Sequence, residues 1–315
     1  MRQRVWLRYP RISGHMAHSS CLFTLSLGVF SRFSWIQASG PPNAYFCPPN
    51  IDVFYDRDRG PWCPRHPAAI TAMVDILPRV ATWGLSGCVA APVAMLLSRP
   101  MTKAQWRYLG IAFVIFLTSG VLLLFPFAFP SLRVGHWNWM GKSLSICATY
   151  FIIFNFKAGD AARRFVTLRQ RPGSGSLSTG LIVLLLLTAV LINVATGGEN
   201  HAPAWETIFF EASMPGIDEE TVFRAGFLGS LVASRQVTQS DNRWVILGSV
   251  LVTSILFGLV HAVTFSTAFR LSFDWQAFVI TAVIGTLLAL IAINSESILL
   301  PVIVHNLVNC LSFIS

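Results

Sequence analysis

Apolar residues gather in runs of membrane-spanning length along most of the chain. A transmembrane helix needs about 20 mostly apolar residues, and in lipid the backbone must satisfy its own hydrogen bonds, which favours helices. The pattern predicts an all-α, polytopic transmembrane bundle of about eight spans. The runs lie near 80–98, 108–129, 138–156, 180–197, 244–262, 276–293 and 297–314, and the shorter, more polar stretch 217–233 supplies a helix for the bundle interior.

The first 78 residues have a different character. They contain "GPPNAYFCPPN" and "RDRGPWCPRHP", which are rich in proline, glycine and charge and resist regular structure. The apolar run 21–30 is too short to span a bilayer, although the arginines before it weakly resemble the start of a signal peptide. We predict a poorly ordered, mostly irregular extension over 1–78, with a start further along the chain as an alternative, and a transmembrane helical domain over 79–315.

Composition agrees with a membrane protein. Hydrophobic residues make up 54% of the chain and charged residues only 12%, with a mean hydropathy of +0.60, whereas soluble domains carry about 25% charged residues. The net charge of +9 is read as basic loops and not as a nucleic-acid surface. The expected surroundings are the lipid bilayer, with no nucleic-acid partner.

The loop charges predict an orientation. One alternating set of loops holds ten Lys or Arg residues and the other holds two, or three if Lys142 lies outside its span. By the positive-inside rule, loop 157–179 is cytoplasmic and loop 198–216 is extracytoplasmic, and "AWETIFFEASMPG" in the latter is suited to a short interfacial helix. A multi-pass protein of the plasma (inner) membrane is expected. The larger set is Arg99, Lys103, Arg107, Lys157, Arg163, Arg164, Arg169, Arg171, Arg235 and Arg243, and the smaller is Arg133 and Arg270.

The six cysteines form no CxxC pair, and their spacing fits no zinc or haem pattern. Cys88, Cys147 and Cys310 lie in apolar runs and are interpreted as small core residues. Cys47 and Cys63 share a polar stretch and would form a disulfide only if that stretch is extracytoplasmic. No cofactor is expected.

Acidic residues occur inside the polar span, where they are costly and therefore candidates for function. In "DEETVFR", Glu220 and Arg224 are four apart on a helix with the acid first, which favours a structural ion pair. Glu219 points about 100° away from Glu220 and is left without that partner. Asp218 begins the helix and is expected at the interface, where it suits the positive end of the dipole.

Two later spans contain further polar residues. Phe257 and His261 share one helix face, and His305 and Asn309, also four apart, are expected mid-helix in the last span. The alternating chain direction puts Glu219 and His261 near the outer ends of their helices. Four groups are thus predicted to meet in one pocket in the outer half of the bundle, where a carboxylate base and N–H donors suit peptide hydrolysis.

The stretches "EETVFR", "FGLVH" and "HNLVN" are the motifs EExxxR, FxxxH and HxxxN in order. Over roughly 180–315, the chain resembles the CPBP family, which comprises type II CAAX prenyl endopeptidases, Abi proteins linked to bacteriocin immunity, and related glutamic intramembrane proteases. One departure is Ala225, which stands where many members have glycine. It is expected to affect packing more than chemistry.

The resemblance implies a role for each matching residue. Glu219 and His261 would activate a water, and His305 and Asn309 would hold the oxyanion. Glu220, Arg224 and Phe257 would support the site, and no metal would be needed. The implied substrate is a membrane or membrane-associated protein or peptide.

Other interpretations stay open at this point. A zinc site built from Glu219, His261 and His305 is chemically conceivable. The same cavity would also serve a non-catalytic scaffold or a bacteriocin-immunity protein, whereas a transporter is disfavoured because no broken-helix pair recurs in two halves. Resemblance to CAAX enzymes suggests prenylated cytosolic substrates. The loop charges, in contrast, predict that the site opens toward the extracytoplasmic face.

Overall fold

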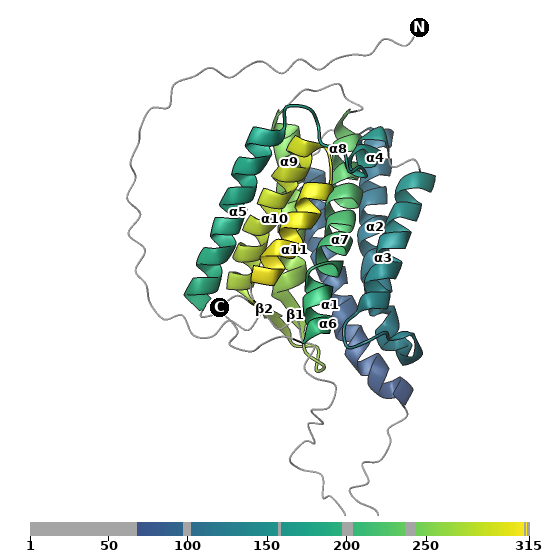
Figure 1. The fold of residues 1–315 in the computed structure, drawn as a ribbon. Helices are drawn as coiled ribbons and strands as arrows, with labels where there is room; N and C mark the ends of the chain where they lie inside the picture. The colour runs from purple at the N-terminus through teal and green to yellow at the C-terminus, as the bar shows by residue number, and fades with distance from the viewer. Residues whose placement is uncertain are drawn as a thin grey trace, which may run out of the picture.

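The fold is a bundle of roughly antiparallel helices (Figure 1). The computed structural model describes residues 68–96, 102–156, 159–196, 204–236, 243–311 and 313. Of the extension predicted over 1–78, residues 1–67 with Cys47 and Cys63 therefore lie outside the described residues. The predicted all-α bundle is confirmed. Its α-helices are α1 (Ala68–Leu96), α2 (Lys103–Ala128), α3 (Trp139–Asn155), α4 (Gly159–Phe165), α5 (Gly175–Thr196), α6 (Trp205–Glu211), α7 (Met214–Glu220), α8 (Gly229–Gln236), α9 (Arg243–Ala262), α10 (Trp275–Ser295) and α11 (Leu299–Leu311).

Four of the described helices are long and apolar enough to cross a membrane. The apolar helices Ile246–Ala262 and Leu299–Leu311 are shorter. The remaining predicted spans, α3 and the polar stretch after α6, have polar or charged residues buried against their neighbours. The bundle therefore combines fully apolar helices with helices that the protein itself shields. The four candidate spans are Ile76–Met95, Gln105–Ala128, Gly175–Ala195 and Trp275–Ser295.

The polar span 217–233, expected as one helix, is built from three consecutive pieces. Helix α7 leads into a π-helix, η2 (Thr221–Leu228), which continues into α8. Every residue of η2 is buried. Such π-turns are rare and occur frequently at functional sites. This composite helix carries the first motif through the middle of the bundle (Figure 1).

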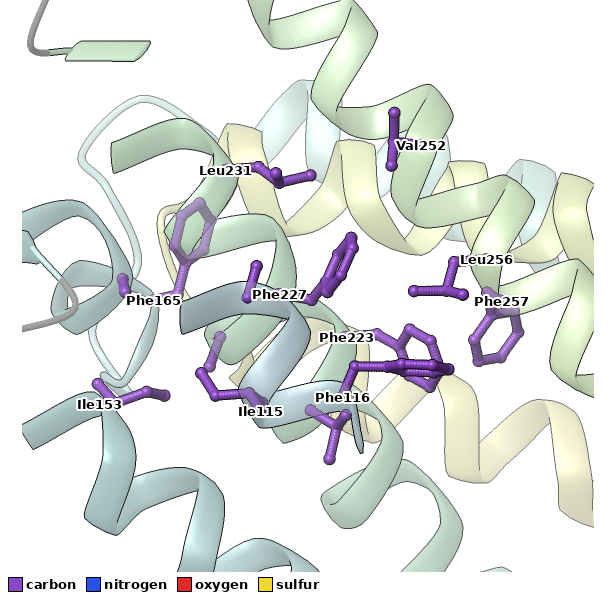
Figure 2. Close-up of a cluster of buried hydrophobic side chains, with 14 of the residues drawn as sticks. Ile115, Phe116, Ile153, Phe165, Phe223, Phe227, Leu231, Val252, Leu256 and Phe257 are labelled. Carbon is purple, nitrogen blue, oxygen red and sulfur yellow. The ribbon is translucent and has the colours of Figure 1, made fainter. Parts of the chain in front are cut away.

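An aromatic cluster packs around this helix (Figure 2). Phe223 meets Phe116 of α2 with ring centroids 6.2 Å apart and Phe257 of α9 at 5.1 Å, both edge-to-face. Phe227 contacts Phe116 in the same geometry at 6.3 Å. Edge-to-face pairs of this kind add about 0.5–1.5 kcal/mol beyond area burial. Three helices are thereby locked together directly beside the polar motifs.

The two ends of the bundle differ in structure. A two-stranded antiparallel hairpin, β1 (Val263–Phe265) and β2 (Leu271–Phe273), follows α9 and lies at the same end as α6 (Figure 1). The arginine-rich connection between α4 and α5 lies at the opposite end. Asp274 caps α10 by accepting hydrogen bonds from the Gln276 and Ala277 N–H groups. The hairpin begins two residues after His261 and so borders the candidate site.

Gly229 allows α8 to approach α4 closely, which yields a stability prediction. A Cβ added at Gly229 would lie 2.7 Å from the Ala162 Cα, which is backbone and cannot rotate away. Gly229→Ala should therefore lower the thermal unfolding midpoint in detergent, because the two helices must separate. Gly110→Ala in α2 is the matched control, since an added Cβ there meets nothing within 4 Å. Equal midpoints for both variants would contradict this close packing.

Candidate active site

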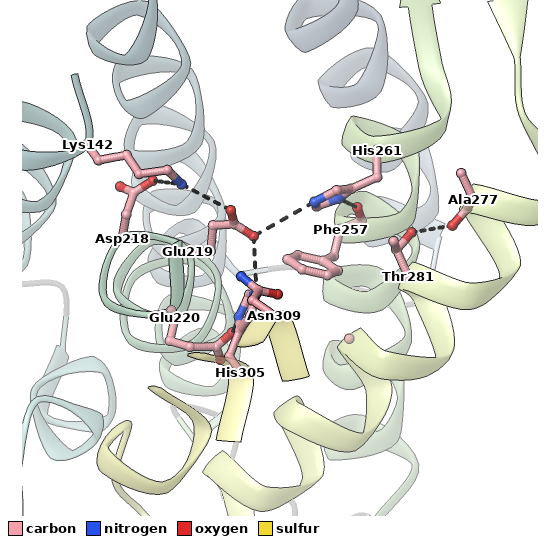
Figure 3. A network of polar contacts seen from close by, with 12 residues as sticks. Lys142, Asp218, Glu219, Glu220, Phe257, His261, Ala277, Thr281, His305 and Asn309 are labelled. Atoms are coloured by element: carbon pink, nitrogen blue, oxygen red, sulfur yellow. Dashed lines mark hydrogen bonds and ion pairs between the residues drawn. The ribbon is translucent and has the colours of Figure 1, made fainter. Parts of the chain in front are cut away.

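Helix α7 holds its acidic residues in place through its first turn. The Gly216 N–H donates to Asn306 Oδ1 of α11 at 2.8 Å, which ties the start of α7 to the last helix. A side chain at Gly216 would collide with Asn306, so the close approach requires glycine there. From this anchored start, Asp218, Glu219 and Glu220 point in three different directions (Figure 3).

Glu219 of α7 contacts side chains from three other helices. Its Oε2 lies 3.8 Å from His261 Nε2 of α9 and 3.8 Å from His305 Nε2 of α11. Its Oε1 accepts a hydrogen bond from Lys142 Nζ at 3.1 Å. The Glu219 side chain is only 13% exposed. The structure thus brings together three of the four residues predicted to be catalytic.

Glu220 has two partners inside the bundle. Its Oε2 lies 3.1 Å from Arg224 Nε, with both side chains fully buried, as the spacing of four predicts. Its Oε1 lies 2.7 Å from His305 Nδ1. The second contact was not anticipated from sequence. Glu220 therefore links the structural ion pair to one of the site histidines.

Besides Glu220, the Arg224 guanidinium contacts a backbone carbonyl group and an aromatic ring. It donates from Nη2 to the Gly285 carbonyl oxygen of α10 at 3.2 Å and lies over the Phe257 ring, 4.6 Å from its centroid. A guanidinium over an aromatic face is attracted by the ring quadrupole. Phe257 also packs 4.6 Å from the His261 ring. Phe257 thus contacts both Arg224 and His261.

Hydrogen bonds define the proton positions on both imidazoles. His261 Nδ1 is 2.7 Å from the Phe257 carbonyl oxygen, which can only accept, so Nδ1 carries the proton. His305 Nδ1 faces the Glu220 carboxylate in the same way. Each ring consequently turns its Nε2 toward Glu219. In its neutral form His261 offers a proton-accepting nitrogen there.

Asn309 lies in a different position from the one expected. Helix α11 ends at Leu311, so Asn309 belongs to its last turn and the mid-helix expectation was wrong. Its Nδ2 donates to Glu211 Oε2 of α6 at 3.1 Å. Asn309 follows His305 by four residues in α11, so the two side chains lie on the same face of that helix. Glu211 orients the Asn309 amide.

Glu211 itself was assigned from sequence only to a loop. The predicted short helix is present as α6, and Glu206 anchors it by accepting hydrogen bonds from the His136 N–H at 2.8 Å and the Trp139 indole at 3.2 Å. Burial raises the pKa of Glu211, although the positive charge of Lys142 acts in the other direction. An acid from outside the motifs thus borders the site.

Asp218 is the main residue that the sequence prediction placed wrongly, and Lys142 is a residue to which it gave no role in the site. Asp218 is 1% exposed and accepts a hydrogen bond from Lys142 Nζ at 3.3 Å, so it is not an interfacial residue. Lys142 is buried within α3, inside the span predicted over 138–156. The available signal was a lone lysine inside the apolar run 138–156, because such a charge requires a partner in the bundle.

The described part of the chain offers no cluster of side chains suited to a metal ion. Among those residues, no group of three or more His, Cys, Asp or Glu is arranged to hold a metal ion. The zinc alternative therefore gains no support from the positions of Glu219, His261 and His305.

Comparison with known proteins agrees with the motifs. Residues 201–311 match the family model of the Rce1-like type II CAAX prenyl endopeptidases. No curated protein and no solved structure matches the chain. This part of the chain is an Rce1-like domain, as the CPBP motifs suggested, and the match supports a CAAX-type membrane protease. The domain runs from the residues before α6 to the end of α11 and leaves Lys142 outside.

The Glu220–Arg224 pair yields a second stability prediction. Arg224→Met leaves the Glu220 carboxylate buried without its cation, which typically costs about 3–5 kcal/mol. Combining Arg224→Met with Glu220→Gln removes the orphaned charge while Gln still accepts from His305 Nδ1. Thermal unfolding in detergent should show a large loss for the single variant and a smaller one for the double variant. A double variant as unstable as the single would contradict an electrostatic origin.

Proposed function

We propose that this protein is an intramembrane endopeptidase that hydrolyses a peptide bond with a water activated by Glu219 and His261. The observation that carries the proposal is the placement of Glu219 Oε2 at 3.8 Å from two imidazole Nε2 atoms. These separations are too long for direct hydrogen bonds but suit a small polar group bound between the side chains. A water held there would meet a carboxylate and an imidazole that both accept protons.

In the proposed reaction, Glu219 and His261 take a proton from this water as its oxygen attacks the scissile carbonyl carbon. The carbonyl oxygen becomes an oxyanion in the tetrahedral intermediate. The proton then passes to the leaving amine when the C–N bond breaks. The enzyme regains its starting protonation state without a covalent intermediate. The chemistry is that of a metal-independent glutamic protease.

His305 and Asn309 are proposed as the oxyanion donors. His305 Nδ1 is engaged by Glu220, so a proton on Nε2 makes the ring an imidazolium flanked by two carboxylates, Glu219 and Glu220. Asn309 contributes an amide whose Nδ2 donates to Glu211 Oε2 at 3.1 Å, and amide N–H groups are of the kind that bind an oxyanion. Donors placed where charge develops are commonly the largest single contribution to such catalysis.

We infer that the substrates are membrane or membrane-associated proteins or peptides, and the match to a CAAX prenyl endopeptidase family supports this inference. The site lies toward the end of the bundle that bears α6 and the hairpin, away from the arginine-rich α4–α5 connection (Figure 1). With the positive-inside rule, this favours a site open to the extracytoplasmic side of the plasma (inner) membrane. Prenylation of the substrate is not part of the proposal.

Substitution of the water-activating residues tests the proposal. Glu219→Gln and His261→Ala should each reduce cleavage of a synthetic peptide library by roughly 100-fold or more, because general-base catalysis contributes that much. Cleavage would be read by mass spectrometry on detergent-purified protein. Glu296→Gln is the matched control, since this acid is 42% exposed and pairs with Arg171 at the other end of the bundle.

Full cleavage by both site variants would sink the assignment. A Glu219→Gln protein that accumulates normally and keeps its cellular phenotype would instead favour the non-catalytic scaffold or immunity interpretation. Comparison of membrane proteomes from cells with wild type and Glu219→Gln would identify the substrate.

A further inference from the structure

A basic pocket lies at the end of the bundle opposite the α6–hairpin end. It has a volume of about 330 Å³, and four arginines and one acid contribute to its lining. The arginines are Arg163, Arg164, Arg169 and Arg171, and the acid is Glu296. The excess of positive charge suits an anionic ligand, because guanidinium groups bind phosphate oxygens in a fixed, often bidentate geometry.

The connection that carries these arginines is fastened to the turn between α10 and α11. Basic residues that only set the orientation of a membrane protein need no fixed structure. The connection between α4 and α5, in contrast, is held at several points. Glu296, in the turn, has a φ of 52°, which non-glycine residues seldom adopt. The backbone that carries the arginines is thus held in place. The fastening bonds are Arg171 N–H to Ser295 O (2.8 Å), Ile298 N–H to Phe165 O (3.0 Å), Gln170 Nε2 to Ser297 Oγ (3.2 Å) and Asn294 Nδ2 to Ser174 O (2.8 Å).

The four arginines differ in how far the protein already satisfies them. Arg171 pairs with Glu296 at 3.6 Å, and Arg163 donates to the Phe154 carbonyl oxygen at 3.0 Å. The side chains of Arg164 and Arg169 make no hydrogen bond or ion pair with the described residues. Two held arginines and two uncommitted ones therefore face the same pocket.

The position of the pocket indicates which anion it meets. Its lining includes Glu296, which directly follows α10, and Pro172, which precedes α5 by three residues, and both helices are candidate membrane spans. The ends of spanning helices lie at the depth of lipid headgroups. Helix α5 also exposes a row of apolar side chains, including Leu177, Leu184, Leu187 and Leu191. We propose that this pocket binds the phosphodiester headgroup of an anionic phospholipid.

Thermal unfolding of purified protein in detergent tests this site with defined lipids. Added phosphatidylglycerol should raise the unfolding midpoint by several degrees, because a ligand that binds only the folded state stabilises it, while phosphatidylcholine should not. In Arg164→Ala/Arg169→Ala the apparent phosphatidylglycerol affinity should fall about tenfold or more. The matched control is Arg133→Ala/Arg270→Ala, which removes the same charge from exposed arginines at the opposite end.

Three results would overturn the proposal. They are equal stabilisation by both lipids, an unchanged affinity in Arg164→Ala/Arg169→Ala, and an equal loss in the control. Inorganic phosphate is the probe for a soluble ligand: protection by phosphate alone, equal to that by phosphatidylglycerol, would also overturn the lipid assignment.

A second inference rests on the proposed function and concerns Lys142. This residue belongs to α3 and lies outside the Rce1-like domain. Its Nζ bridges Asp218 Oδ2 at 3.3 Å and Glu219 Oε1 at 3.1 Å (Figure 3). The Lys142 side chain is 7% exposed. An ammonium group between the Asp218 and Glu219 carboxylates reduces the repulsion between their two negative charges.

We infer that Lys142 is a positioning residue for the water-activating carboxylate. By holding Oε1 of Glu219, it turns Oε2 toward the Nε2 atoms of His261 and His305. Without Lys142, Glu219 would lose both its orientation and its nearest cation. The charged or titratable groups around Glu219 are then Asp218 and Glu220 of α7, Arg224 of η2, His261 of α9, His305 of α11 and Glu211 of α6.

Kinetics across pH test this role. Lys142→Met should lower kcat between about 10- and 100-fold, because misplacement of a catalytic group by about 1 Å can cost that much. The acid limb of its pH–activity profile should move to higher pH, since the cation that favours the ionised form of Glu219 is gone. Lys142→Arg should keep the position of the limb, a rescue that a purely structural role would not produce.

A companion variant guards against failure to fold. Lys142→Met/Asp218→Asn removes one positive and one negative charge together, and it should fold yet remain slow. The positioning role would be refuted if Lys142→Met kept the wild-type kcat and the wild-type acid limb of the pH–activity profile. The proposed function would still stand in that case, provided that Glu219→Gln is inactive. Cleavage by Glu219→Gln would refute the proposed function instead.

Discussion

The burial of three consecutive carboxylates on α7 is the constraint on which the rest of the structure depends. An uncompensated buried charge costs several kcal/mol, so each acid needs a partner inside the bundle. Lys142 bridges Asp218 and Glu219, and Arg224 pairs with Glu220. Because Lys142 comes from α3 and the facing histidines come from α9 and α11, satisfying α7 brings four helices together.

The need for partners also gives neighbouring acids of α7 different roles, one structural and one proposed to be chemical. Glu220 is held on both sides, by Arg224 at 3.1 Å and His305 at 2.7 Å, and so it orients other groups. Glu219 is held on one oxygen only, and its second oxygen faces two imidazole nitrogens at 3.8 Å. The aromatic cluster around Phe223 and Phe257 packs beside these groups and limits their movement. Reactive and structural acids thus lie one residue apart.

Much of the fold and part of the site could be predicted from the sequence. The apolar runs located the long helices, since a helix in lipid must be apolar on its outer surface. The spacing of four found the Glu220–Arg224 pair, and the alternating chain direction brought Glu219, His261 and His305 together. The expectations for Asp218 and for Asn309 mid-helix were wrong. Local patterns indicate what a residue can pair with along one helix, but not which neighbouring helix faces it.

The sequence by itself therefore determined the class of fold, the three motifs and the identity of the charged residues that must be compensated. Only the tertiary structure decided that Lys142 reaches across from α3, that Glu211 approaches Asn309, and that four arginines line one pocket. The physical reason is that helix periodicity relates residues a turn apart, whereas contacts between helices depend on packing, rotation and helix length. Those contacts form only in the assembled bundle, where every buried charge must find a partner on a neighbouring helix or on its own.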